Sequence, residues 1–204
     1  MAVLLDELHV SRRKFTVDDY HKMAEAGILT EDDRVELLDG EIVEMRPIGP
    51  RHQGRTDRLN ALFTARCGEH AIVRVQGLIR LGRRSEPEPD LALLRPRPDF
   101  YTPGHPRPGD VLLVVEIADT SAALDRQVKL GLYARAKVRE VWLLVISRDR
   151  RQHAYSDGAS PVLEVYRRPA GGIYTEIRLV RAGEKIVPEA LSEIEFSADE
   201  LLAE

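Results

Sequence analysis

The sequence predicts a mixed α/β domain, and three observations support this fold class. Short apolar runs at residues 91–94, 111–115 and 141–146 are typical of buried strands. A helical segment between the second and third runs indicates a crossover connection and a parallel strand pair. Short strand-like segments at the C-terminal end predict additional antiparallel strands. A hydrophobic fraction of 43% in 204 residues is enough for one core.

The N-terminal half predicts a loose lead-in over residues 1–13, followed by a single domain over 14–204. Thr16 to Asp19 resembles a capping box, with Asp19 in place of the usual Glu or Gln, and begins a helix that ends near Ala26. Asp39-Gly40 between two strand-like segments is typical of a tight hairpin turn. The remaining elements of this half are a helix within 50–68 and a strand over 71–81 with an irregularity at Gly77.

The C-terminal half begins with five prolines between residues 95 and 110, which predict a surface loop. Thr120 or Ser121 then caps a helix that reaches about Lys137. Ser197 to Glu200 is a capping box that begins a short closing helix. The antiparallel strands of this half are expected at 152–155, 162–166 and 173–180, with turns at Asp157-Gly158 and Gly171-Gly172.

The overall charge, 30 basic against 34 acidic side chains, gives no argument for binding nucleic acid. Residues 46–84, however, hold nine arginines against Asp57 and Glu69. Such a segment either steers a polyanion to one face or consists of ordinary solvated arginines. Cys67 is the only cysteine, which excludes an intramolecular disulfide and predicts a packed core thiol. Without a recognisable signal peptide or membrane span, the protein is expected to be soluble and cytoplasmic.

Two of the apolar runs each present a carboxylate. Asp90 precedes the run 91–94, and Glu116 follows the run 111–115. A charged carboxylate at the end of a buried strand is costly unless a cation, a metal or a hydrogen-bond network compensates it. Two such carboxylates on neighbouring strands would make a hard oxygen site suited to Mg²⁺ or Mn²⁺.

A lysine on the following helix completes the constellation. Asp125, Lys129 and Tyr133 are spaced to share one helix face, so Lys129 could reach the two carboxylates or pair only with Asp125 at the surface. His52 follows Arg51 at the start of the arginine-bearing helix and is either a phosphate contact or an ordinary polar residue. Four further histidines lie in different elements without metal-ligand spacing and are assigned no role: His21, His70, His105 and His153.

These sequence motifs resemble those of a known family. Pro89-Asp90, Glu116 and a downstream lysine are similar to the PD-(D/E)xK nuclease superfamily. More narrowly, Val-Glu-Ile-Ala-Asp-Thr-Ser at 115–121, the Asp125-xxx-Lys129-xxx-Tyr133 spacing and the hairpin at 35–42 resemble the Uma-two family of bacterial restriction-endonuclease-like proteins. The resemblance spans about residues 12–200. One departure is that Ala118 stands where the superfamily has its lysine, which in this family has moved to the helix position of Lys129.

The resemblance implies a restriction-endonuclease-like mixed β-sheet flanked by helices, with antiparallel strands added at the C-terminal end. It implies that Asp90, Glu116 and the backbone carbonyl of Ile117 bind Mg²⁺ or Mn²⁺, and that Lys129 orients the attacking water or stabilises the transition state. Glu36 resembles an extra acid of such nucleases, as a ligand or a base, or is one more charge of an acidic segment. The residues expected to bind substrate are Arg51, His52, Arg55 and Tyr133.

The function implied is metal-dependent hydrolysis of DNA phosphodiester bonds by a homodimer, because cutting both strands needs two sites. Two alternatives stay open. The first is a catalytically silent nucleic-acid-binding or regulatory module on the same fold. The second is a structural domain in which Asp90 and Glu116 are paired with basic side chains such as Arg80, Arg83 or Lys129.

Overall fold

A computed structural model describes residues 12–30, 32–118, 125–146 and 162–203. Its centre is a six-stranded sheet of order β3-β4-β5-β6-β7-β8, in which β5 and β6 are parallel and every other neighbouring pair is antiparallel. The mixed sheet and its parallel pair are therefore confirmed. The strands are β3 (Ile72–Val75), β4 (Leu91–Leu94), β5 (Val111–Ala118), β6 (Glu140–Val145), β7 (Val162–Ala170) and β8 (Ile173–Val180).

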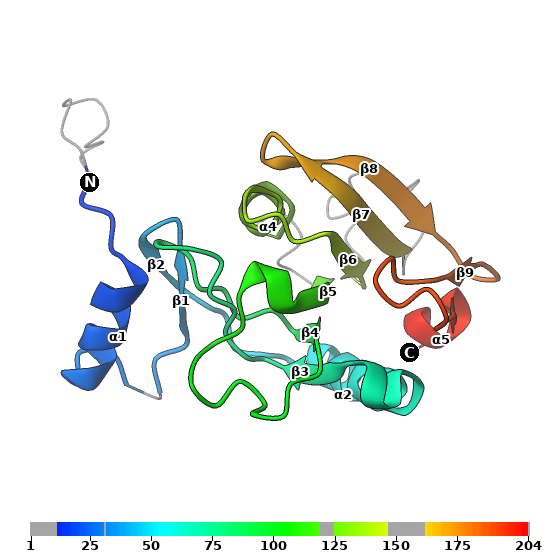
Figure 1. Ribbon diagram of the computed structural model, residues 1–204, viewed down its shortest axis with the longest axis horizontal. Helices are drawn as coiled ribbons and strands as arrows, with labels where there is room; N and C mark the ends of the chain where they lie inside the picture. Colours follow the sequence, from blue (N-terminus) through cyan, green and yellow to red (C-terminus); the bar gives the residue numbers. More distant parts are fainter. Residues whose placement is uncertain (1–11, 31, 119–124, 147–161, 204) are drawn as a thin grey trace.

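Helices cover both faces of this sheet, with α2 (Pro50–Cys67) on one face and α4 (Leu130–Arg135) on the other (Figure 1). The alternation of strand side chains explains the two layers. Leu113, Val115 and Ile117 of β5 pack in the core with α2 and the closing helix α5 (Ala198–Leu202), whereas Val114 and Ala118 pack in the core with α4. Both faces are apolar, so β4, β5 and β6 are buried along their whole length.

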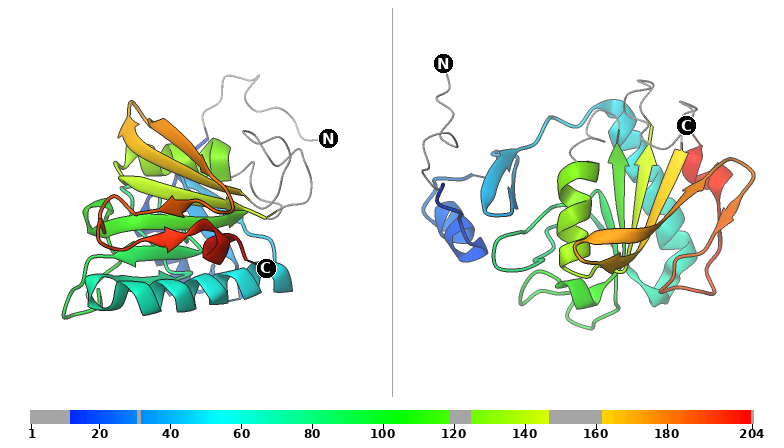
Figure 2. Two further views of the ribbon diagram at one scale, coloured as in Figure 1. Left: turned by 90° about the vertical axis from the view of Figure 1, so that its right-hand side faces the viewer. Right: turned by 90° about the horizontal axis from the view of Figure 1, so that it is seen from above.

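The N-terminal elements form a separate layer beside the sheet. Helix α1 (Val17–Glu25) has the predicted capping box of Thr16 and Asp19. Strands β1 (Val35–Leu38) and β2 (Glu41–Glu44) form a two-stranded hairpin, which lies with α1 on the side of the molecule opposite β8 (Figures 1 and 2).

The hairpin turn requires its glycine. Asp39 and Gly40 both have positive φ, of 49° and 79°, as a type I′ turn demands. A Cβ added to Gly40 would lie 2.7 Å from the Cβ of Lys14 and 2.9 Å from the carbonyl oxygen of Phe15. The turn therefore packs directly against the chain that leads into α1.

The predicted strand over residues 71–81 is wrong beyond Val75. Gln76 adopts a positive φ of 45°, and its N–H bonds to the carbonyl of Asp90 at 3.0 Å. The chain then pairs loosely with the segment that returns to β4, through bonds from Ile79 N–H to Pro87 and from Leu81 N–H to Ser85. This turn back towards β4 positions the residues that precede Asp90.

The structure confirms three further predictions. They are the loop between β4 and β5, which includes a short 3-10 helix (Pro108–Asp110), the β7–β8 hairpin with its turn at Gly171-Gly172, and the Ser197 capping box of α5. The expected strand at 152–155, the turn at Asp157-Gly158 and the caps Thr120 and Ser121 lie outside the described residues. The smaller elements not yet named are a 3-10 helix (Gly68–His70) and strands β9 (Lys185–Ile186) and β10 (Phe196–Ser197), which pair antiparallel.

The helix predicted over residues 121–137 is divided in the part that the structure describes. Asp125–Lys129 is a π-helical turn, and Leu130–Arg135 is the α-helix α4. Short π-helical turns are frequent at functional sites. Lys129 is the last residue of this turn, so the wider turn sets the direction in which the lysine leaves the backbone.

Candidate active site

Asp90 and Glu116 meet at one end of the β4–β5 pair. Leu91 pairs with Val115 in the antiparallel ladder, so the carboxylate that precedes β4 lies beside the one near the end of β5. Asp90 Oδ2 accepts a hydrogen bond from the N–H of Ile117 at 2.8 Å, and Glu116 Oε2 accepts one from the N–H of Asp90 at 3.4 Å. The backbone of each strand therefore helps to orient the carboxylate of the other.

Lys129 lies between β5 and β6 in the sequence, and its side chain reaches Glu116 and Glu36. Its Nζ lies 3.4 Å from Glu116 Oε1 and 3.1 Å from Glu36 Oε1, and its side chain is only 4% exposed. The sequence left two placements open for Lys129, at the surface or at the site, and in the structure the lysine lies inside the site. Burial of an ammonium is tolerated only with such compensation, so Lys129 and the two carboxylates are mutually dependent.

Glu36 reaches the site from β1, outside the main sheet. Its Oε1 accepts a hydrogen bond from the N–H of Glu88 at 2.8 Å in addition to its ion pair with Lys129. Its Oε2 is buried and has no hydrogen-bond partner among the described residues. The hairpin therefore contributes a carboxylate with unused ligand capacity to the centre of the site.

Glu88 is a further acidic group at the site that the sequence analysis did not identify. Burial raises its pKa, the negative charges of Glu36 and Asp90 add to this, and Arg34 and Lys129 oppose it. A signal was present in the sequence Pro87-Glu88-Pro89-Asp90. A residue before proline favours an extended backbone, and residues two apart in an extended chain point to the same side, so this pattern makes Glu88 and Asp90 neighbours.

His52 lies in the first turns of α2, and its Nε2 is 2.7 Å from Asp90 Oδ1. Asp90 therefore has a ring nitrogen on one oxygen and a backbone N–H on the other. Arg51, next to His52, is exposed on the same helix. The structure thus brings His52 to the acidic site, whereas the sequence placed it only at the start of the helix.

Two residues expected to bind substrate have other surroundings. Arg55 is buried, and its Nη1 donates to the carbonyl of Leu202 at 2.7 Å, so this guanidinium joins α2 to α5. Tyr133 is fully buried on α4 and donates its hydroxyl to Glu116 Oε1 at 2.7 Å. Both side chains are buried, and their part in binding substrate stays a prediction.

The arrangement brings together carboxylate oxygens that could hold a metal ion and places a lysine next to them. The site consists of carboxylates near the ends of two adjacent strands, a third carboxylate from a hairpin, and a lysine from the crossover segment. It lies on a mixed sheet with helices on both faces (Figure 1). This fold and this order of acidic and basic groups define the restriction-endonuclease-like class.

The chain belongs to the Uma2 family, which carries the description "putative restriction endonuclease" and whose profile matches residues 17–200. No curated protein matches the chain. A similar solved structure is that of "a putative nuclease belonging to DUF820 from Anabaena variabilis ATCC 29413". It shares 15% sequence identity and a TM-score of 0.64, with 93% of this chain and 98% of that one covered. The family is nuclease-like, which implies a nucleic acid as substrate. Among the residues described, no helix is long and apolar enough to cross a membrane.

Proposed function

We propose that this protein is a divalent-metal-dependent endonuclease that hydrolyses phosphodiester bonds of DNA. The observation that carries this proposal is the contact of the Lys129 ammonium group with both Glu36 and Glu116, with Asp90 beside Glu116 and Glu88 beside Glu36. Carboxylates in excess of the ammonium group are costly in a buried setting. Divalent cations with oxygen ligands are the usual compensation.

The donor set fits Mg²⁺ or Mn²⁺. Asp90 and Glu116 supply carboxylate oxygens, and the buried Oε2 of Glu36 has no hydrogen-bond partner among the described residues. The N–H of Ile117 bonds to Asp90. Because the N–H and C=O of a strand residue point to the same side of the strand, the Ile117 carbonyl points to the side on which Asp90 lies. Asp90, Glu116 and this carbonyl would hold the ion.

A bound Mg²⁺ or Mn²⁺ would polarise a phosphoryl oxygen and lower the pKa of a water molecule. Lys129 would orient that water or stabilise the charge that develops on the phosphoryl oxygens. Glu36 and Glu88 would serve as a further ligand or as the proton acceptor. Tyr133 and His52 would hold Glu116 and Asp90 in place through the hydrogen bonds described above.

The exposed arginines of the basic segment support a polyanionic substrate. Arg51 lies directly beside His52 at the start of α2 and would contact a phosphate. Arginine side chains near a site raise the local concentration of a polyanion through its charge. The exposed members of the segment are Arg46, Arg51, Arg58, Arg66, Arg83 and Arg84.

A calorimetric titration of Mn²⁺ into the wild type and Asp90→Asn, with a thermal melt of each, tests the metal site. Binding to the wild type that is at least tenfold weaker in a folded Asp90→Asn variant is the expected result. The control Asp57→Asn removes an exposed carboxylate from α2 and should bind Mn²⁺ as the wild type does. Equal affinity in all three proteins would refute the assignment of Asp90.

Cleavage of DNA is tested separately, with plasmid, linear duplex and single-stranded substrates in Mg²⁺ or Mn²⁺ and RNA for comparison. Cleavage by the wild type that disappears in Asp90→Asn is expected. DNA binding without cleavage in either metal would instead indicate the silent binding module. Sedimentation with and without DNA tests the proposed homodimer, which would present two sites to a duplex.

A further inference from the structure

A second cluster of possible metal ligands lies outside the carboxylate site. His21 of α1, Glu86 of the segment before β4 and His105 of the β4–β5 loop each offer one ligand atom, and these atoms all lie within 4.8 Å of one another. His21 Nε2 is 2.5 Å from Glu86 Oε2, and the rings of His21 and His105 are 5.9 Å apart and nearly perpendicular. Three segments distant in the sequence therefore direct donors to one point.

Glu86 supplies independent evidence that this point receives a ligand. The residue is fully buried, and while Oε2 faces His21, the buried Oε1 has no hydrogen-bond partner among the described residues. A buried carboxylate oxygen without a partner costs free energy and calls for an explanation, such as an ion. A cation held by Glu86 and the two imidazoles would remove this cost.

The backbone holds the three ligands in place before any ion arrives. The N–H of Glu86 bonds to the carbonyl of Leu37 in β1 at 2.8 Å. Pro106, next to His105, accepts a bond from the N–H of Arg80 at 2.9 Å, and the N–H of Val17 at the start of α1 bonds to Arg83 at 2.9 Å. A site whose ligands stand on anchored backbone loses less entropy when it binds.

We propose that His21, Glu86 and His105 bind a divalent transition-metal ion, with Zn²⁺ as the best-suited member of this class. Imidazole nitrogens favour Zn²⁺ over Mg²⁺, and two histidines with one carboxylate leave the fourth position of a tetrahedral ion for water. Ligand atoms around such an ion lie about 3.3 Å apart, and those of the cluster lie within 4.8 Å of one another. Small shifts of the three side chains would complete the site.

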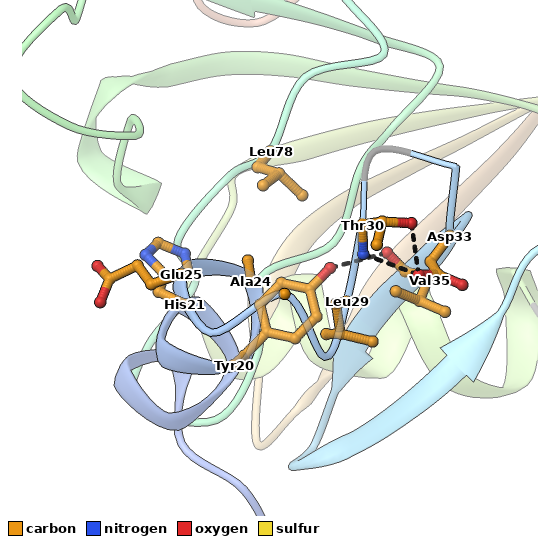
Figure 3. A pocket seen from close by; sticks show the side chains of 10 residues that line it. Tyr20, His21, Ala24, Glu25, Leu29, Thr30, Asp33, Val35 and Leu78 are labelled. Atoms are coloured by element: carbon orange, nitrogen blue, oxygen red, sulfur yellow. Dashed lines mark hydrogen bonds between the residues drawn. The ribbon is translucent and has the colours of Figure 1, made fainter.

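The site would connect α1 to the hairpin that carries Glu36. Glu86 pairs with Leu37, the residue after Glu36, and lies two residues before Glu88. His21 lies with Tyr20 on the rim of a pocket whose other walls include Leu78 and Val35 (Figure 3). The Tyr20 hydroxyl donates to the Val35 carbonyl at 2.9 Å, so α1 and β1 are already in contact here. Bound metal would reinforce this contact.

The test titrates Zn²⁺ into the full-length wild type and His105→Ala, and records the visible absorption of Co²⁺ in both. His105 is exposed, so its replacement should leave the fold intact, which circular dichroism checks. The matched control is His70→Ala, which also removes an exposed imidazole. We expect one Zn²⁺ per chain in the wild type and in His70→Ala, and affinity at least tenfold weaker in His105→Ala. A tetrahedral Co²⁺ spectrum should likewise be lost only in His105→Ala.

Asp90→Asn separates this proposal from the proposed nuclease site. Zn²⁺ binding that persists in Asp90→Asn and weakens in His105→Ala supports the second site whether or not Mn²⁺ binds at the carboxylates. Zn²⁺ binding that is lost in Asp90→Asn but kept in His105→Ala would overturn it, as would no saturable binding in the wild type. Glu86→Gln gives a second check, since it should also weaken Zn²⁺ binding.

Discussion

Lys129 Nζ lies 3.1 Å from Glu36 Oε1, an ion pair between the crossover segment and a hairpin that is not part of the main sheet. Both side chains are almost completely buried. The same ammonium lies 3.4 Å from Glu116 Oε1, so one lysine joins the hairpin to the end of β5. The position of the hairpin at the site therefore depends on the charge of Lys129.

Lys129→Met should destabilise the protein and abolish nuclease activity. The substitution keeps most of the apolar stem but leaves Glu36 and Glu116 as buried carboxylates without their cation, a change that typically costs about 3–5 kcal/mol. Chemical denaturation would measure the loss. The control Lys22→Met removes an exposed lysine of α1 and should change stability by less than about 0.5 kcal/mol. Wild-type stability in Lys129→Met would contradict the ion-pair assignment.

Tyr133→Phe isolates the hydrogen bond to Glu116. The tyrosine is fully buried, and its hydroxyl donates to the carboxylate oxygen that also faces Lys129. Loss of a hydrogen bond to a charged group should reduce the free energy of unfolding by about 1.5–3 kcal/mol. Denaturant melts would show whether this occurs. An unchanged midpoint would mean that the hydroxyl contributes nothing to holding Glu116.

His52→Ala should weaken Mn²⁺ binding without preventing folding. The ring of His52 contacts Asp90 at 2.7 Å, and groups that orient a metal-binding carboxylate typically change metal affinity by about 10–100-fold. Calorimetry would measure the affinity. His70→Ala is the control, and equal effects of the two substitutions would show that contact with Asp90 has no influence on the metal.

The sequence predicts those parts of the molecule that local pattern determines. Asp90 and Glu116 flank apolar runs that are typical of buried strands, and the Asp39-Gly40 turn follows from the conformational freedom of its residues. The shared helix face of Lys129 and Tyr133 likewise led to two residues that contact Glu116.

The remaining features depend on contacts between distant segments. Gln76 ends β3 because its N–H bonds to Asp90, and no periodicity in residues 71–81 predicts that turn. His21 and His105 have no metal-ligand spacing in the sequence, yet the fold brings both to Glu86. Arg55 belongs to the basic segment, but its guanidinium is buried and donates to the carbonyl of Leu202 in α5, which is distant in the sequence.

Glu140 gives a prediction of how stability depends on pH. It is fully buried at the start of β6, and its oxygens accept hydrogen bonds from the indole of Trp142, the guanidinium of Arg167 and the N–H of Glu189. Burial nevertheless raises the pKa of the Glu140 carboxyl above its ordinary value of 4.5, since desolvation outweighs these hydrogen bonds and the charge of Arg167. The folded state therefore favours the protonated carboxyl more than the unfolded state does.

A raised pKa contributes stability that is fully present below pH 4.5 and is lost as the pH rises through the higher value of the folded protein. Glu140→Gln cannot titrate at this position, so the wild type should lose stability relative to this variant as the pH rises from about 4 to about 8. Denaturation curves of both proteins across this range measure the difference, with Glu69→Gln as the control for removal of an exposed carboxylate. A difference that grows in favour of the wild type with rising pH would show that Arg167 and the hydrogen bonds outweigh desolvation, and a constant difference would show that they only offset it.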